Sequence, residues 1–312
     1  MQRLLTISIP TYNRAVFLDH QLAWLFKAIQ GFEDQCEIFV SDNCSTDHTP
    51  QIIQQWQDRF QTTPFRWNRN DENVGLMNNI GCCIRAAAGK FVWVIGDDDP
   101  INEKAIAYII QTLSESSDLT WLNLNFSCRD GINNTLIFER CYPVESDYVD
   151  SNGRAVFEAC LRHNNSGVGV MTAQVYRTTL VQQALAAWPD LTNGEAQVYW
   201  TGFCAFHGSV KISPDTYLEY IAGTASWMRD KKQLIRMHYT YLPEVYAKIS
   251  EVGYSKDFCR SLVINHFLRN NWRVFLGAIR RWPMLTLQVM SRYLLLVYRV
   301  CLYSNWRFTK FL

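Results

Sequence analysis

The chain has 312 residues, of which 48% are hydrophobic, so it can bury a sizeable core as one large domain or one domain plus an extension. Glycine and proline are infrequent, which argues against extensive disorder. The net charge of +1 hides an asymmetry, because residues 260–312 contain nine basic side chains and no acidic one. A basic tail on an acidic body favours an anionic surface as a partner.

The cysteines and the first residues bear on the cellular compartment. Ten cysteines are scattered along the chain without a CxxC pair, which favours reduced thiols packed as small hydrophobic groups. The apolar run at 4–9 is too short for the core of a signal peptide and is typical of a buried strand. We therefore expect no secretory signal and a cytoplasmic protein.

Strand and helix patterns alternate over the first 125 residues. Strands are expected at 4–9, 36–41, 65–68, 91–95 and 119–126. Helices are expected at 15–30, 49–60, 76–88 and 103–114, the third of them closed by Gly89 as its C-cap. Strands separated by helices of this length predict an α/β fold, with a mostly parallel sheet flanked by helices on both faces.

The pattern is less regular beyond residue 126. Strands are expected at 136–138, 167–173 and 210–212, helices at 177–187 and 195–206, and a largely helical segment from about 232. We therefore divide the chain into a domain at 1–230 and a helical, basic and aromatic extension at 231–312.

Polar loops follow the first four expected strands, at 10–14, 41–47, 68–75 and 96–99. Ligands of open α/β sheets bind outside the carboxyl ends of the strands. Because the ends of parallel strands share one edge, the four loops predict a single site.

The loop at 96–99 contains three consecutive carboxylates, Asp97, Asp98 and Asp99, directly after a buried strand. Their mutual repulsion is costly unless a cation or solvent relieves it. Mg²⁺ and Mn²⁺ prefer oxygen ligands and are often held by one or two carboxylates plus the phosphates of a substrate. The alternative is a solvated acidic turn.

Tyr12 and Asp42 are suited to a nucleoside, with the ring stacked on a base and the carboxylate accepting from a base N–H or a ribose hydroxyl. The alternatives are a packed tyrosine and a turn aspartate. Residues 45–47 alternatively cap the next helix. Residues 73–75 fit a turn at a helix start, where backbone N–H groups could face phosphate or sugar.

Together, the segments 8–14, 41–47, 73–75 and 96–99 resemble glycosyltransferase family 2, most closely its abequosyltransferase-like branch in bacterial surface-polysaccharide synthesis. The resemblance covers residues 1–125 well. It implies a GT-A fold, a nucleotide-sugar donor, a divalent metal and inversion at the anomeric carbon. It also divides the domain into a nucleotide-sugar half at 1–125 and an acceptor half at 126–230.

By matching position, the resemblance places Tyr12 and Asp42 at the base, Asp98 toward the ribose and sugar, and Asp99 on an Mn²⁺ or Mg²⁺ ion. The family commonly has an Asp where this chain has Gly96, so Asp97 is a second candidate metal ligand. UDP- and dTDP-sugars are the favoured donors. The expected nucleotide-sugar residues are Pro10, Thr11, Tyr12, Asn13, Arg14, Asp42, Asn43, Asn73, Gly75, Asp97 and Asp98.

An inverting transferase needs a general base to deprotonate the acceptor hydroxyl. In the family this carboxylate lies before a helix about 100 residues after the metal motif. Glu195 fits that place, although the usual acidic pair is reduced to Glu195-Ala196, and Asp190 is the second candidate. The alternative is that both are ordinary acids near a helix N-terminus.

The tail at 260–312 interleaves Trp, Tyr, Leu and Arg, and Arg292 and Arg299 interrupt its apolar stretch. This pattern predicts helices in the interface of an anionic membrane rather than a spanning helix. A helical subdomain packed on the core, or a homo-oligomer interface, is the alternative. No nucleic-acid recognition motif is present, so no nucleic-acid partner is expected.

We therefore expect a glycosyltransferase on the cytoplasmic face of the cell membrane that acts on a glycan or lipid-linked acceptor. Two other hypotheses remain. One is a membrane-associated binding protein that keeps the nucleotide site without turnover. The other is a sugar nucleotidyltransferase, although residues 10–14 do not form its usual glycine-rich, basic phosphate loop.

Overall fold

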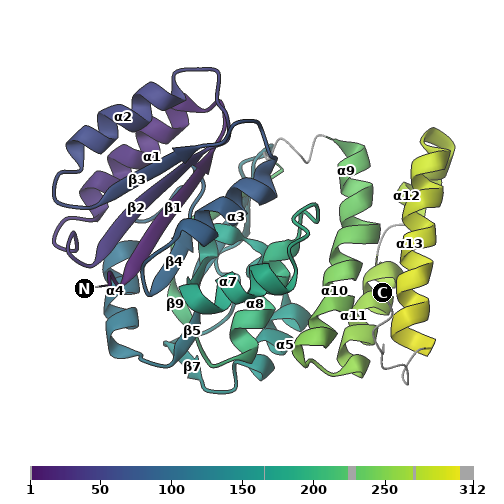
Figure 1. The fold of residues 1–312 in the computed structure, drawn as a ribbon. Helices are drawn as coiled ribbons and strands as arrows, with labels where there is room; N and C mark the ends of the chain where they lie inside the picture. The colour runs from purple at the N-terminus through teal and green to yellow at the C-terminus, as the bar shows by residue number, and fades with distance from the viewer. Residues whose placement is uncertain (1, 165, 224–229, 270–271, 303–312) are drawn as a thin grey trace, which may run out of the picture. The chain divides into compact units, whose positions relative to one another are not determined.

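The computed structural model describes residues 2–164, 166–223, 230–269 and 272–302 (Figure 1). Within them, nine strands form one sheet in the order β3-β2-β1-β4-β8-β5-β9-β7, with β6 paired to β5. The strands are β1 (Leu5–Thr11), β2 (Cys36–Asp42), β3 (Phe65–Arg69), β4 (Phe91–Val94), β5 (Leu119–Asp130), β6 (Leu136–Phe138), β7 (Tyr148–Asp150), β8 (Gln174–Arg177) and β9 (Ser209–Ala222).

The four N-terminal strands are parallel, as predicted. β1 pairs with β2 and β4, and β2 pairs with β3. The strand order therefore reverses between β1 and β4, the kind of switch point at which open α/β sheets bind ligands. The final residues of three strands are in register, Thr11 beside Asp42 and Asp42 beside Arg69.

The prediction of a strand at 167–173 is wrong. The structure has a short helix α6 (Ser166–Gly169) and a 3₁₀ turn η1 (Met171–Ala173) there, and the strand is β8, antiparallel to both β4 and β5. The Gln174 side chain donates to the carbonyls of Gly167 and Val170, at 2.8 and 3.0 Å. These carbonyls are thus satisfied by a side-chain amide rather than by a neighbouring strand.

Helices cover both faces of the N-terminal sheet. Figure 1 shows α1 (Ala15–Ala28) and α2 (Thr49–Arg59) on one face of β1–β3, and α3 (Leu76–Ala86) on the other. α3 ends at Ala86, earlier than predicted, and Gly89 is not its C-cap. A Cβ at Gly89 would lie 2.7 Å from the backbone nitrogen of Thr6, so this glycine is needed for close backbone contact instead.

The next helices along the chain, α4 to α8, lie between residues 105 and 206. α4 (Ala105–Glu115) precedes β5, α5 (Gly153–His163) precedes α6, and α7 (Thr178–Ala187) and α8 (Ala196–Phe206) lie between β8 and β9. α5 and β7 were not expected from the sequence. The expected strand at 210–212 is part of a much longer strand, β9.

By packing, the chain forms two compact units. The first comprises residues 1–192 and 200–223, and the second comprises 193–199 and 224–312. The predicted division into domains at residue 230 stays a prediction. Residues 193–199, which include the first turn of α8, thus belong to the second unit, whereas the rest of α8 belongs to the first.

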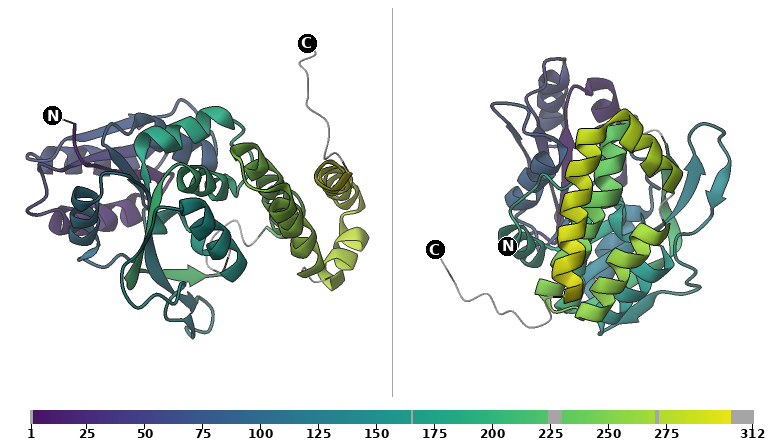
Figure 2. Two further views of the ribbon diagram at one scale, coloured as in Figure 1. Left: turned by 90° about the horizontal axis from the view of Figure 1, so that it is seen from below. Right: turned by 90° about the vertical axis from the view of Figure 1, so that its right-hand side faces the viewer.

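The described residues of the second unit are largely helical from residue 231, as expected. It contains α9 (Lys231–Arg236), a π-helical turn η3 (Met237–Tyr241), α10 (Leu242–Val252), α11 (Lys256–Arg269), α12 (Trp272–Arg281) and α13 (Pro283–Leu302) (Figure 2). Ile235, Tyr239, Ala278 and Val289 form a buried cluster that joins α9, η3, α12 and α13. No helix in the described residues is long and apolar enough to cross a bilayer.

Candidate functional site

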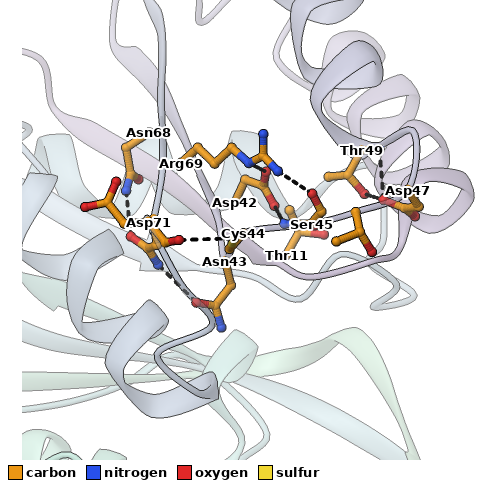
Figure 3. Close-up of polar contacts among 12 residues, drawn as sticks. Thr11, Asp42, Asn43, Cys44, Ser45, Asp47, Thr49, Asn68, Arg69 and Asp71 are labelled. Carbon is orange, nitrogen blue, oxygen red and sulfur yellow. Dashed lines mark hydrogen bonds and ion pairs between the residues drawn. The ribbon is translucent and has the colours of Figure 1, made fainter.

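Asp42 lies at the centre of the sheet edge formed by the ends of β1–β3 (Figure 3). Its side chain is 0% exposed, and Oδ1 accepts from the backbone N–H of Ser45 at 3.0 Å. Oδ2 is buried without a hydrogen bond and lies 3.4 Å from Nε of Arg69. Oδ2 therefore has unused acceptor capacity beside Arg69, although it is closed off from the surface.

Arg69 was not among the predicted site residues. Besides its contact with Asp42, it donates to the Ser45 carbonyl at 2.6 Å, and about half of its side chain is exposed. The sequence contained one signal, the position of Arg69 at the end of a strand next to that of Asp42. Tyr12, just after β1, is 40% exposed, so its ring is accessible at the same edge.

The loops after β1 and β2 brace each other. Asn13 has a φ of 52°, and its side-chain oxygen accepts from the backbone N–H of Thr46 at 2.7 Å. Asp47 accepts from the backbone N–H groups of Ala15 and Thr49. Asp47 therefore braces the chain where α1 and α2 begin, but it is not the N-cap of α2, which is His48 without a side-chain cap hydrogen bond.

Three asparagines hold the loop that precedes α3. Asn43 donates to Oδ1 of Asn73 at 2.8 Å and accepts from Asn70 at 3.1 Å and from the backbone N–H of Val74 at 3.0 Å. Asn73 also accepts from the N–H of Gly75, whose φ of 82° favours glycine. The polar groups of Asn43 and Asn73 are thus engaged in shaping this loop.

Asp97 connects the ends of β4 and β1. It accepts from the Thr11 hydroxyl at 2.7 Å and from Nε of Arg14 at 2.8 Å. Arg14 also donates to Asp98, so one guanidinium bridges two carboxylates. Burial raises the pKa of Asp97 to about 6, although Thr11 and Arg14 act in the opposite direction. Pro10 is the penultimate residue of β1, paired in register with Ser41.

The side chain of Asp99 forms a hydrogen bond within its own loop. It accepts from the N–H of Gly96 at 2.8 Å and from the hydroxyl of Thr172, a residue of η1 that the sequence did not indicate. A Cβ at Gly96 would lie 2.6 Å from the Asp99 carboxylate, so a larger residue there would displace that carboxylate. Burial raises the pKa of Asp99, because the site desolvates its charged form.

The donor set can be compared with the needs of a divalent cation. In the described part of the chain, no three His, Cys, Asp or Glu side chains form a group that could hold a metal ion. The partly buried Asp99 carboxylate nevertheless offers the oxygen ligand that a hard cation prefers, and a cation would relieve its desolvation cost. The residues fit a cation held by one or two carboxylates and ligand phosphates, and do not fit one held by protein alone.

The two candidate bases differ in their surroundings. Glu195 precedes α8 in the second unit, and burial raises the pKa of its carboxyl from 4.5 to about 7. Asp190 is exposed in the first unit, where Oδ1 accepts from the N–H and the hydroxyl of Thr192. The structure thus brings together the predicted residues at the ends of β1–β4, which belong to the first unit, whereas Glu195 belongs to the second.

Comparison with known proteins places this site in a family. The profile of "Glycosyl transferase family 2" matches residues 6–165, about half of the chain, so the chain belongs to that family. An abequosyltransferase (RfbV) of Salmonella typhimurium is 31% identical over 116 residues, which is 37% of this chain and 34% of the relative. The fold is of the GT-A type.

The solved structures that share this fold include two glycosyltransferases. The poly(ribitol-phosphate) β-N-acetylglucosaminyltransferase TarS of Staphylococcus aureus is 24% identical over 198 residues, which is 62% of this chain and 31% of the relative. Its fragment 1–349 with UDP-GlcNAc has a TM-score of 0.68 and 16% identity, covering 95% of this chain and 82% of the fragment. A Pyrobaculum calidifontis mannosyltransferase, PcManGT, with GDP-Man and Mn²⁺ has a TM-score of 0.54 and 13% identity, covering 98% and 89%.

The sequence matches span about a third of the length of the two named relatives. The structural matches lie below 25% identity and concern the fold.

Proposed function

We propose that the chain is an inverting, metal-dependent glycosyltransferase that moves a sugar from a nucleoside-diphosphate sugar to a hydroxyl of a glycan or glycolipid, in polysaccharide or cell-surface biosynthesis. The observation that carries this proposal is the set of groups at the β1/β4 switch point. There Asp97, Asp98 and Asp99 lie at the sheet edge that also holds Tyr12 and Asp42. The names of the abequosyltransferase and TarS support the reaction class.

The nucleotide occupies the ends of β1–β3 in this proposal. The accessible ring of Tyr12 stacks on the base, and the Asp42 carboxylate accepts from a base N–H once the base settles over it. Arg69 holds the Asp42 carboxylate in place. The loops that contain Pro10–Arg14, Asn43 and Asn73–Gly75 form the walls of the nucleotide site. A uridine or thymidine donor is favoured, and the UDP-GlcNAc bound by TarS supports that choice.

Asp99 is the first candidate ligand for Mn²⁺ or Mg²⁺ and Asp97 the second, because Arg14 already neutralises Asp97. A bound metal would stabilise negative charge on the leaving diphosphate. Asp98, half exposed beside Arg14, is left to face the ribose and sugar. The Mn²⁺ ion bound by PcManGT supports metal dependence in this fold.

Glu195 acts as the general base. Its carboxylate removes the proton of the acceptor hydroxyl as the hydroxyl oxygen attacks the anomeric carbon and the bond to the diphosphate breaks on the opposite face. A carboxyl with a pKa of about 7 is matched to this task near neutral pH. Asp190 is the second candidate, and its hydrogen bonds to Thr192 favour a role in the turn.

The second unit attaches the protein to the cytoplasmic face of an anionic membrane. On α13, Met284, Leu287, Leu294 and Tyr298 are exposed, and their spacing of three, seven and four residues places them on one helix face. Arg280 and Arg281 at the end of α12, and Arg292 and Arg299 on α13, are also exposed, which suits anionic headgroups. A lipid-linked acceptor would be presented at such a surface. Homo-oligomerisation through this face is the competing outcome.

A thermal-shift screen tests the donor site. UDP, dTDP and GDP and their sugar conjugates are each added with Mn²⁺, with Mg²⁺ and with EDTA. A ligand at 100 times its Kd stabilises the folded state by about 2.7 kcal/mol, which is several degrees in Tm. A metal-dependent rise with one nucleotide, followed by sugar transfer or donor hydrolysis, is expected. Binding without turnover would favour the degenerate binding protein, and no rise on folded protein would contradict the donor site.

A further inference from the structure

Asn193 holds the segment that contains Glu195 within the second unit. Its side chain is 2% exposed and makes three hydrogen bonds. The amide nitrogen donates to the Tyr241 carbonyl at 3.0 Å and to Oε2 of Glu244 at 3.2 Å, and Oδ1 accepts from the N–H of Glu195 at 2.9 Å. One buried side chain thus connects the candidate base to two helical turns of the second unit.

Two further features connect the segment around Glu195 to η3. A Cβ added at Gly194 would contact the Tyr241 ring at 3.4 Å, so the backbone lies close against that ring. Tyr241 is the last residue of η3, and π-helical turns inside helices are frequent at functional sites. The ionisable groups Tyr241 and Glu244 lie against the segment, and Glu244 contacts the amide of Asn193.

We propose that Asn193 is a positioning residue that fixes Glu195 by clamping its backbone to η3 and α10. This inference rests on the proposed role of Glu195 as the base. Its physical basis is that a base must be held within fractions of an ångström of the hydroxyl that it deprotonates. Burial, which the clamp maintains, also keeps the carboxyl in the environment that raises its pKa.

Substitutions at Asn193 distinguish its bond to the Glu195 N–H from its bonds to Tyr241 and Glu244. Asn193→Ala removes all three hydrogen bonds, whereas Asn193→Asp keeps an acceptor for the Glu195 N–H and loses the donors to Tyr241 and Glu244. Combining Asn193→Asp with Glu244→Gln restores a donor on the opposite side. Tyr293→Phe is the matched control, because it removes a 3.0 Å hydrogen bond to the Val263 carbonyl elsewhere in the same unit.

The readouts are kcat and donor KM across pH, together with the titration of the Glu195 carboxyl by ¹³C NMR, assigned by comparison with Glu195→Gln. For Asn193→Ala we expect at least a tenfold lower kcat, a donor KM within twofold, and a Glu195 titration at least one pH unit more acidic. Asn193→Asp should behave similarly, with partial recovery when Glu244→Gln is added. Tyr293→Phe should lower Tm without moving the titration or kcat.

Two results separate this inference from the proposed function. Full turnover in Glu195→Gln would overturn both the assigned base and the clamp. Loss of turnover in Glu195→Gln, with wild-type kcat and an unmoved carboxyl titration in Asn193→Ala, would overturn the clamp alone. The NMR titration decides the question even for a protein without turnover, because a Glu195 carboxyl unaffected by Asn193→Ala is not held by Asn193.

Discussion

Nε of Arg14 lies 2.8 Å from Oδ1 of Asp97, which joins the loop after β1 to the loop after β4 across the switch point of the sheet. The same guanidinium reaches Asp98. Arg14 thus supplies positive charge to the acidic loop from within the protein. Asp99, which faces Gly96 and Thr172 instead, is left as the partly buried carboxylate that a metal would neutralise.

Removing Arg14 should destabilise the fold. Arg14→Gln leaves the buried Asp97 carboxylate without its ion pair, and we expect the free energy of unfolding to fall by about 1–3 kcal/mol, since Arg14 itself is partly exposed. Urea denaturation measures the change. Adding Asp97→Asn should recover most of the loss, because no buried charge is then left unpaired. An unchanged stability in Arg14→Gln would show that the ion pair contributes little.

Asp99 should matter for the metal and not for folding. Burial disfavours its charged form, so Asp99→Asn should leave Tm equal or higher at neutral pH. The same variant should lose the Mn²⁺-dependent part of the stabilisation by the nucleotide sugar, which a thermal shift with and without EDTA measures. Retention of that metal-dependent shift would exclude Asp99 as the ligand.

Tyr12 should contribute stacking energy to nucleotide binding. Tyr12→Ala is expected to weaken binding of the nucleoside diphosphate by about 1–3 kcal/mol, roughly tenfold per 1.4 kcal/mol, because the accessible ring is lost. Tyr12→Phe keeps the ring and should bind nearly as the parent does. Isothermal titration gives both values, and equal affinity in all three proteins would place the base elsewhere.

Glu195 should set the pH dependence of both activity and stability. Its pKa is raised from 4.5 to about 7, and only the deprotonated form is a base, so kcat/KM should rise with pH with a midpoint near 7. Between these two values the folded protein keeps a proton that the unfolded chain has released. The free energy of unfolding should therefore fall as pH rises through this window. Glu195→Gln should abolish turnover and reduce that fall, and an acidic limb near pH 4–5 would contradict the assignment.

The exposed face of α13 should bind anionic lipid. Leu287→Glu combined with Leu294→Glu introduces charge on that face, and we expect loss of sedimentation with phosphatidylglycerol vesicles. Gln51→Glu with Gln55→Glu on α2 makes the same change in net charge at exposed positions of the first unit and should have no effect. If the α13 variant still sediments, or if it instead dissociates an oligomer, the membrane assignment fails.

The sequence by itself determined the N-terminal half of the fold and the loops of the site. Period-two and helical patterns identified β1–β4 with their helices, since buried strands and amphipathic helices leave local signatures. The motif order located Tyr12, Asp42 and the run Asp97–Asp99. Because parallel strands share one edge, the local order of these loops was sufficient to predict that they meet.

Only the tertiary structure decided the partners of those residues. Arg69 beside Asp42, Thr172 on Asp99 and the clamp by Asn193 depend on register, on the insertion of β8 between β4 and β5, and on the return of residues 193–199 to the helical unit. These contacts join segments that are far apart in the chain. A single polar side chain forms no periodic pattern, so its long-range partner cannot be predicted from the local sequence. Local sequence encodes the element, whereas the burial and charge of each site residue are set by what folds against it.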